Sequence, residues 1–113
     1  MKAAFPGRSF QLWEYKVSHG MMLVRSPKSA EAPSNIDVMF AGVEYADVPR
    51  YFSELRIEEP DPADLSFARK KLGKQETAAT VTVLECEGRR YVVVASGIKV
   101  VENDMDIFES PFQ

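Results

Sequence analysis

Residues 77–101 read TAATVTVLECEGRRYVVVASGIKVV, and this stretch decides the fold. Valine and threonine are enriched in β-strands, and Glu87-Gly88-Arg89 interrupts them with residues typical of a tight turn. A turn centred on Glu87-Gly88 or on Gly88-Arg89 predicts the same two faces. One face carries Leu84, Cys86, Tyr91, Val93 and Ala95, and the other carries Val83, Glu85, Glu87, Arg90, Val92 and Val94. We expect both faces to be buried away from the turn.

Residues 10–27 predict another hairpin, because β-branched and aromatic residues flank His19-Gly20. A two-residue turn at this dipeptide would pair Tyr15 with Val24 and would place Glu14 opposite Arg25. One face of this hairpin would then collect Trp13, Tyr15, Val17, Met22 and Val24.

The rest of the chain predicts a loop, two strands and one helix. Residues 26–34 are rich in serine and proline and predict a surface loop. Residues 35–45 predict a central strand, either covered on both faces or bulged at Gly42, and residues 55–58 predict another strand. Asp61 is a candidate N-cap, Pro62 suits the first helical position and Gly73 suits the C-terminal cap, so we expect a helix over about residues 62–72.

These elements predict an α+β fold, mainly an antiparallel curled sheet or small barrel of six or seven strands with one α-helix. A chain of 113 residues can bury one hydrophobic core, so we expect a single domain over residues 1–113. Its acidic end, residues 102–113, is expected to be a loose tail anchored by Phe108 and Phe112. The expected core includes Trp13, Tyr15, Val17, Val24, Phe40, Leu84, Tyr91 and Val93.

Composition argues against several classes of function. The net charge of −3 does not favour phosphate binding, so we expect no nucleic-acid partner. Cys86 is the single cysteine, which rules out an intrachain disulfide or a cysteine-based zinc site and suits a reducing compartment. Residues 1–7 lack the apolar run of about 7 residues found in signal peptides, and no apolar run approaches the ~18 residues of a membrane span. We therefore expect a cytoplasmic protein without a membrane partner.

Residues that could carry chemistry have simpler structural explanations. Adjacent residues at a strand end point to opposite faces, so Ser18 and His19 do not form a nucleophile and base, and His19 is expected to adopt the positive φ of a turn. Glu85 and Glu87 have a spacing that occurs in glycosidases, but Arg90 across the hairpin favours a salt-bridged surface. Cys86 is expected to pack inward as an inert side chain. We predict no catalytic residue, no metal site and no cofactor.

Charge is unevenly distributed along the chain. Residues 1–28 carry five basic and one acidic side chain, residues 44–64 carry seven acidic and two basic ones, and residues 102–109 carry four acidic and no basic ones. Such asymmetry can steer a partner, or the segments can lie together and neutralise one another. Both interpretations stay open at this point.

The leading hypothesis is a non-catalytic binding or protein-interaction module, self-association included, with Tyr45, Tyr51 and Phe52 as exposed aromatic candidates. The alternative is a small-molecule pocket inside the curled sheet, lined by Trp13, Tyr15, Met22, Met39 and Tyr91, with Arg25 or Asp37 holding a polar group. A hydrolytic enzyme that uses His19 or the Glu85 and Glu87 pair comes third. If Asp37 is buried beside Arg25, Lys16 or Tyr15, it becomes the best polar candidate.

Overall fold

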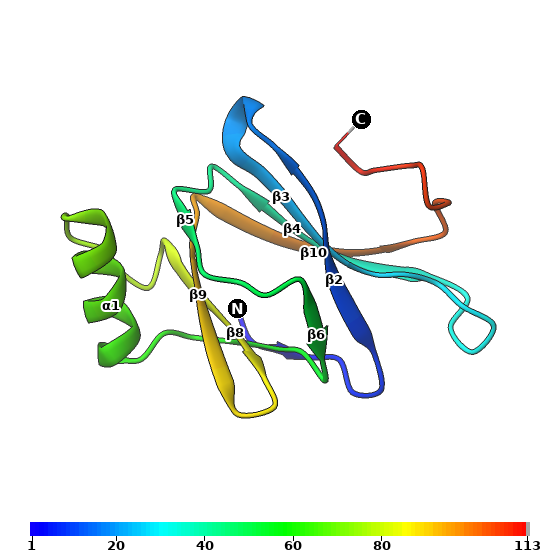
Figure 1. Cartoon of the computed structure of the whole chain (residues 1–113), viewed down its shortest axis with the longest axis horizontal. Helices are drawn as coiled ribbons and strands as arrows, with labels where there is room; N and C mark the ends of the chain where they lie inside the picture. Colours follow the sequence, from blue (N-terminus) through cyan, green and yellow to red (C-terminus); the bar gives the residue numbers. More distant parts are fainter. Residues whose placement is uncertain (113) are drawn as a thin grey trace.

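The computed structural model describes residues 1–112, which form ten β-strands and one α-helix (Figure 1). The strands make two five-stranded sheets in which all neighbouring strands are antiparallel. The helix-side sheet has the order β1 (Ala3–Ala4), β7 (Arg56–Glu58), β8 (Val81–Cys86), β9 (Arg89–Val94) and β5 (Tyr45–Ala46). The tail-side sheet has the order β10 (Gly97–Asn103), β4 (Asn35–Ala41), β3 (Met21–Ser26), β2 (Ser9–Lys16) and β6 (Tyr51–Ser53).

The hairpin of β8 and β9 confirms the predicted turn and its two faces, whereas residues 97–101, expected to continue the hairpin, belong to β10 in the other sheet. Glu87 and Gly88 form the turn with φ angles of 52° and 79°, and Glu85 lies directly opposite Arg90. Leu84 and Val93 are fully buried on the face that packs against the tail-side sheet. The other face is also buried, because Val81, Val92 and Val94 pack against the helix. Burial on both faces explains why these strands consist mainly of apolar residues.

The helix α1 (Pro62–Leu72) has the predicted bounds and caps. Asp61 is the N-cap, and its side chain accepts a hydrogen bond from the Asp64 backbone N–H while the Asp64 carboxylate accepts one from the Asp61 backbone N–H. Gly73 ends the helix with φ 71°, a left-handed conformation that glycine adopts without strain. Ala68 is fully buried where α1 packs on the sheet. With 11 residues, α1 is too short to cross a membrane, and it is the one α-helix that the described chain contains.

The predicted strand count and the barrel alternative are wrong. The two sheets do not close into a barrel, because no strand of one sheet pairs with a strand of the other in the described chain. Ten strands form instead of six or seven because β1, β5 and β6 have only two or three residues. Segments this short carry no hydrophobic periodicity that a sequence pattern could reveal.

The predicted register of the first hairpin is also wrong. Four residues, 17–20, separate the paired Lys16 and Met21, and a β-bulge interrupts the pairing between Leu12 and Glu14. Consequently Gln11 lies opposite Arg25, and Glu14 lies opposite Leu23 instead of Arg25. His19 does have the positive φ that was predicted for it, 64°.

This register corrects the predicted core. Val24, Phe40, Leu84 and Val93 are buried as expected, and Tyr91 is partly buried against the same cluster. Tyr15 and Val17 are 50% and 87% exposed, because the helix-side sheet does not cover that end of the hairpin. The bulge places Trp13 on the opposite face, where it is partly buried.

The acidic end of the chain lies against the outer face of the tail-side sheet. Glu102 and Asn103 belong to β10, and the segment after them, residues 104–112, is called the tail below. Arg25 donates a hydrogen bond to the Glu109 carbonyl, and Ser110, which is 8% exposed, donates one to Glu14. Phe108, an expected anchor, is 88% exposed and makes no such contact with the sheet.

Candidate functional site

A buried ion pair lies at the centre of the outer face of the tail-side sheet. Arg25 on β3 and Asp37 on β4 are directly opposite each other and are 1% and 0% exposed. The Arg25 Nε and Nη2 atoms donate to the two Asp37 carboxylate oxygens at 2.7 and 2.9 Å. This two-point geometry is the strong form of an arginine–carboxylate contact. The sequence makes Asp37 the best polar candidate if it is buried beside Arg25, and the structure meets this condition.

Two asparagines extend the ion pair toward the tail. Asn103 Nδ2 donates to Asp37 Oδ2 at 2.8 Å. Asn35 Nδ2 donates to Asn103 Oδ1 at 2.9 Å and to the Met105 carbonyl at 2.8 Å. Arg25 Nη1 donates to the Glu109 carbonyl at 3.0 Å. The network therefore holds the tail at both Met105 and Glu109.

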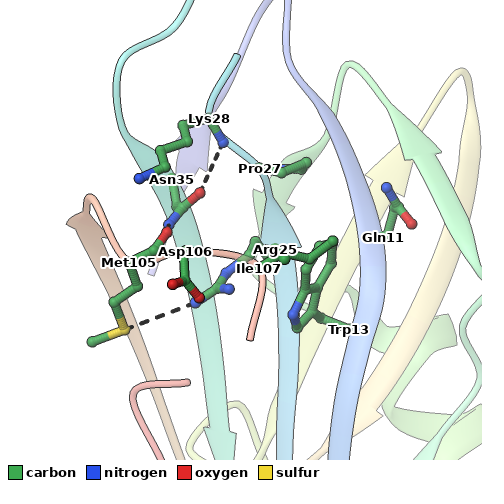
Figure 2. Close-up of a pocket in the computed structure, with 9 residues that line it drawn as sticks. All are labelled: Gln11, Trp13, Arg25, Pro27, Lys28, Asn35, Met105, Asp106 and Ile107. Atoms are coloured by element: carbon green, nitrogen blue, oxygen red, sulfur yellow. Dashed lines mark hydrogen bonds between the residues drawn. The ribbon is translucent and has the colours of Figure 1, made fainter. Parts of the chain in front are cut away.

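Trp13 is positioned by the bulge in β2. The extra residue of a bulge is left unpaired and re-aims its side chain. The Arg25 guanidinium carbon lies 5.2 Å from the centre of the Trp13 ring, within the range of a cation–π contact. Figure 2 shows Arg25 between Trp13 on one side and Met105 on the other.

An open pocket of about 330 Å³ lies between this face and the tail; we call it the tail pocket (Figure 2). Its walls are mainly apolar, and the lining residues are Gln11, Trp13, Arg25, Pro27, Lys28, Asn35, Met105, Asp106 and Ile107. The Gln11 amide has no hydrogen-bond partner among residues 1–112. The pocket thus offers apolar contact together with the uncommitted Gln11 amide.

Residues 106–109 form a turn, called the tail turn below, that displays two apolar side chains. Ile107 is 65% exposed and Phe108 is 88% exposed. The Asp106 carboxylate accepts a hydrogen bond from the Phe108 N–H at 2.8 Å, and the Asp106 N–H donates to Glu109 Oε1 at 2.9 Å. The Glu109 N–H donates to the Asp106 carbonyl at 3.0 Å. These bonds hold the turn that exposes both side chains, and Ile107 also lines the tail pocket.

The structure brings together only part of the predicted binding set. Trp13 and Arg25 line the tail pocket, and Asp37, which is fully buried, pairs with Arg25. Tyr15 and Tyr45 line a separate open groove of about 340 Å³ with Leu12, Met22, Val43, Glu44, Ala46 and Val48. Tyr51 is 59% exposed on β6, beneath the Arg50 guanidinium.

Two expectations about these residues are wrong. Phe52, expected to be an exposed aromatic, is 1% exposed because its strand pairs with β2 and directs it into the core beside Tyr91. The five residues expected to line an interior pocket are not brought together either. Met22 is buried in the core, Met39 lies on the outer face of the sheet and Tyr91 belongs to the other sheet.

The catalytic candidates occupy structural positions. His19 and Ser18 are exposed on the 3-10 turn that connects β2 to β3. Arg90 and Arg56 both pair with Glu85, whereas Glu87 lies in the hairpin turn. Cys86 is buried, and its thiol donates to the Ser53 carbonyl. Within residues 1–112, no three His, Cys, Asp or Glu side chains converge to hold a metal ion.

Sequence patterns missed several residues of this site. Gln11, Asn35 and Asn103 are remote in sequence from one another, and only the strand order places them on one face. A signal for the tail turn was present, because residues 104–109, DMDIFE, mix three acidic with three apolar residues. The same mixture is also typical of a loosely attached segment, so the sequence alone did not predict an ordered surface there.

No protein-family model, curated protein or solved structure matches the chain. We therefore infer its function from the geometry of the site. That geometry offers an apolar pocket, two displayed apolar side chains and a buried ion pair that is satisfied by hydrogen bonds. Such an arrangement suits binding.

Proposed function

We propose that this chain is a non-catalytic protein-interaction module whose partner contacts the tail turn and the tail pocket. The observation that carries the proposal is the display of Ile107 and Phe108 on a hydrogen-bonded turn, where Ile107 lines an apolar pocket and Phe108 follows it. Single exposed apolar residues are common, but two adjacent ones beside a pocket form a continuous apolar surface. Burying an isoleucine or a phenylalanine on binding is worth about 1.5–3 kcal/mol each.

The hydrogen bonds of the tail support this function because they reduce the entropy cost of binding. A displayed side chain that is already held in place loses less conformational freedom when a partner covers it. Asp106 and Glu109 hold the turn, and Arg25 and Asn35 hold the tail on the sheet. We also propose a cytoplasmic location, which the single cysteine supports.

A peptide selection tests the proposal. Peptides selected from a random display library on the wild-type protein should bind at the tail turn. Phe108→Ser should weaken their binding about 30-fold, as expected for a central apolar contact. The matched control is Tyr51→Ser, which removes another exposed aromatic side chain and should leave binding unchanged. Selected peptides that bind Phe108→Ser as well as the wild type would contradict the proposal.

The second candidate function is small-molecule binding in the tail pocket. It is supported by the volume of about 330 Å³, at the lower end of the range for ligand pockets, and by the uncommitted Gln11 amide. Trp13 is the only tryptophan, so its fluorescence reports on this pocket directly. A compound that binds there should change Trp13 emission and should lose affinity in Gln11→Ala. Compounds that change the emission equally in both proteins would count against this function.

A further inference from the structure

The two ends of the molecule carry opposite, unneutralised charge. Figure 1 shows α1 at one end of the longest axis and the tail toward the other end. The principal extents are 43 × 32 × 20 Å, so the two ends are well separated compared with the Debye length of about 8 Å at physiological salt. Their charges therefore do not neutralise each other within one chain.

The acidic end surrounds the displayed apolar side chains. Residues 102–109 contribute four carboxylates, and none of these makes an ion pair within residues 1–112. Lys28 and Lys16 contact the tail, but they donate to the backbone carbonyls of Asp104 and Phe112 and not to a carboxylate. The tail turn is consequently an apolar tip with a negative rim.

The basic end is the last turn of α1. Arg69, Lys70 and Lys71 are exposed there, and Lys70 and Lys71 have no carboxylate partner in the described part of the chain. Lys71 Nζ lies 5.4 Å from the centre of the Phe67 ring, which is only partly buried. This surface combines a partly exposed aromatic ring with a positive rim, so it complements the tail turn in both respects.

We infer that the partner of the tail turn is a second copy of this chain, which receives Phe108 beside Phe67 and the tail carboxylates beside Lys70 and Lys71. This inference rests on the proposed function, since it names the partner of the same surface. Two copies lying antiparallel would form the contact twice and close the assembly as a dimer. A different protein with a basic apolar surface is the competing occupant. The four carboxylates would oppose attachment to an anionic membrane.

The first test is the solution mass, measured by sedimentation equilibrium or light scattering over a concentration series at low salt. The mass should rise above that of one chain with concentration, and about 1 M NaCl, where the Debye length is about 3 Å, should reverse this rise. Phe108→Ser should raise the dissociation constant about 30-fold, and Tyr51→Ser should not change it. A mass of one chain at every concentration at low salt overturns the inference, as does a dimer that Phe108→Ser leaves intact.

The second test is an exchange of charges. Lys70→Glu and Asp104→Lys should each raise the dissociation constant at least about threefold, because each puts like charges together. Both substitutions in one chain should restore association. Both side chains are exposed and make no hydrogen bond or ion pair in the described residues, so neither substitution removes a side-chain contact of the fold. Failure of the double variant to recover overturns the inference.

The two proposals can fail separately. If the chain is a monomer but the selected peptides require Phe108, the protein-interaction function stands. The inference that the partner is a second copy of the chain is then wrong. If neither association nor peptide binding depends on Phe108, the proposed function itself is wrong.

Discussion

Arg25 and Asp37 show how two residues can organise a face of a sheet. Moving both charges out of water is unfavourable, and their mutual attraction does not by itself make the pair a source of stability. The pair instead orders its neighbours: Arg25 also donates to the Glu109 carbonyl, and Asp37 also accepts from Asn103. These bonds define where the tail lies and therefore shape the tail pocket.

Removal of one partner of this pair should be far more damaging than removal of both. Asp37→Ala leaves the Arg25 charge buried and uncompensated, so it should lower the free energy of unfolding by about 3–5 kcal/mol. The double variant Arg25→Met/Asp37→Leu should recover most of that loss, because it leaves no buried charge. Urea denaturation measures both changes. A loss below about 1 kcal/mol for Asp37→Ala would mean that water reaches Arg25.

At the N-terminus of α1, the local capping residues and a tertiary contact stabilise the same structure. Asp64 completes the capping box, and its Oδ2 accepts a hydrogen bond from Arg90 Nη2 at 2.6 Å. Burial alone would raise the pKa of Asp64, but the Arg90 guanidinium and the Asp61 backbone N–H together hold that pKa below its ordinary value. Arg90 in turn joins α1 to the strand β9.

This lowered pKa predicts a pH dependence of stability. The folded state favours the Asp64 carboxylate, so its contribution is present above the unfolded pKa of about 3.9 and is lost as the pH falls through the folded pKa. Asp64→Asn should lower the free energy of unfolding by about 1–3 kcal/mol at neutral pH. The difference between wild type and variant should shrink below about pH 4. Urea denaturation across a pH series tests this, and a constant difference would exclude Asp64 as the titrating group.

At the scale of the whole molecule, one cluster of buried side chains joins the two sheets. Phe40 and Val24 enter it from the tail-side sheet, and Leu84 and Val93 enter it from the helix-side sheet. The helix packs on the far side of one sheet, and the tail lies on the far side of the other. Unfolding of one sheet would therefore expose the inner face of the other sheet to water.

This shared core predicts a single unfolding transition. Phe40→Ala should cost about 3–5 kcal/mol, because Phe40 is fully buried between the sheets. Trp13 fluorescence follows the tail-side sheet, whereas helical circular dichroism follows α1 on the other sheet. Both midpoints should fall together in the variant. Midpoints that separate would show that the sheets unfold independently.

Local signals in the sequence determined the hairpin of β8 and β9 and the helix α1. Glu87 and Gly88 adopt the positive φ angles of a tight turn, and the flanking valines pair in the only register that this turn allows. Asp61, Pro62 and Gly73 mark the helix ends through contacts with residues no more than four positions away. Each of these features depends on near neighbours, so the sequence carries it without the rest of the fold.

Only the tertiary structure decided the candidate site. The bulge at Trp13 changed the strand register, and a change of one residue reverses which face a side chain occupies. The crossing between sheets at Gly97 set β10 beside β4 and so brought Asn103 to Asn35. Arg25 and Glu109 are 84 positions apart, and no local pattern encodes their contact. Such contacts form because the packed sheets leave each buried charge only a few partners within reach.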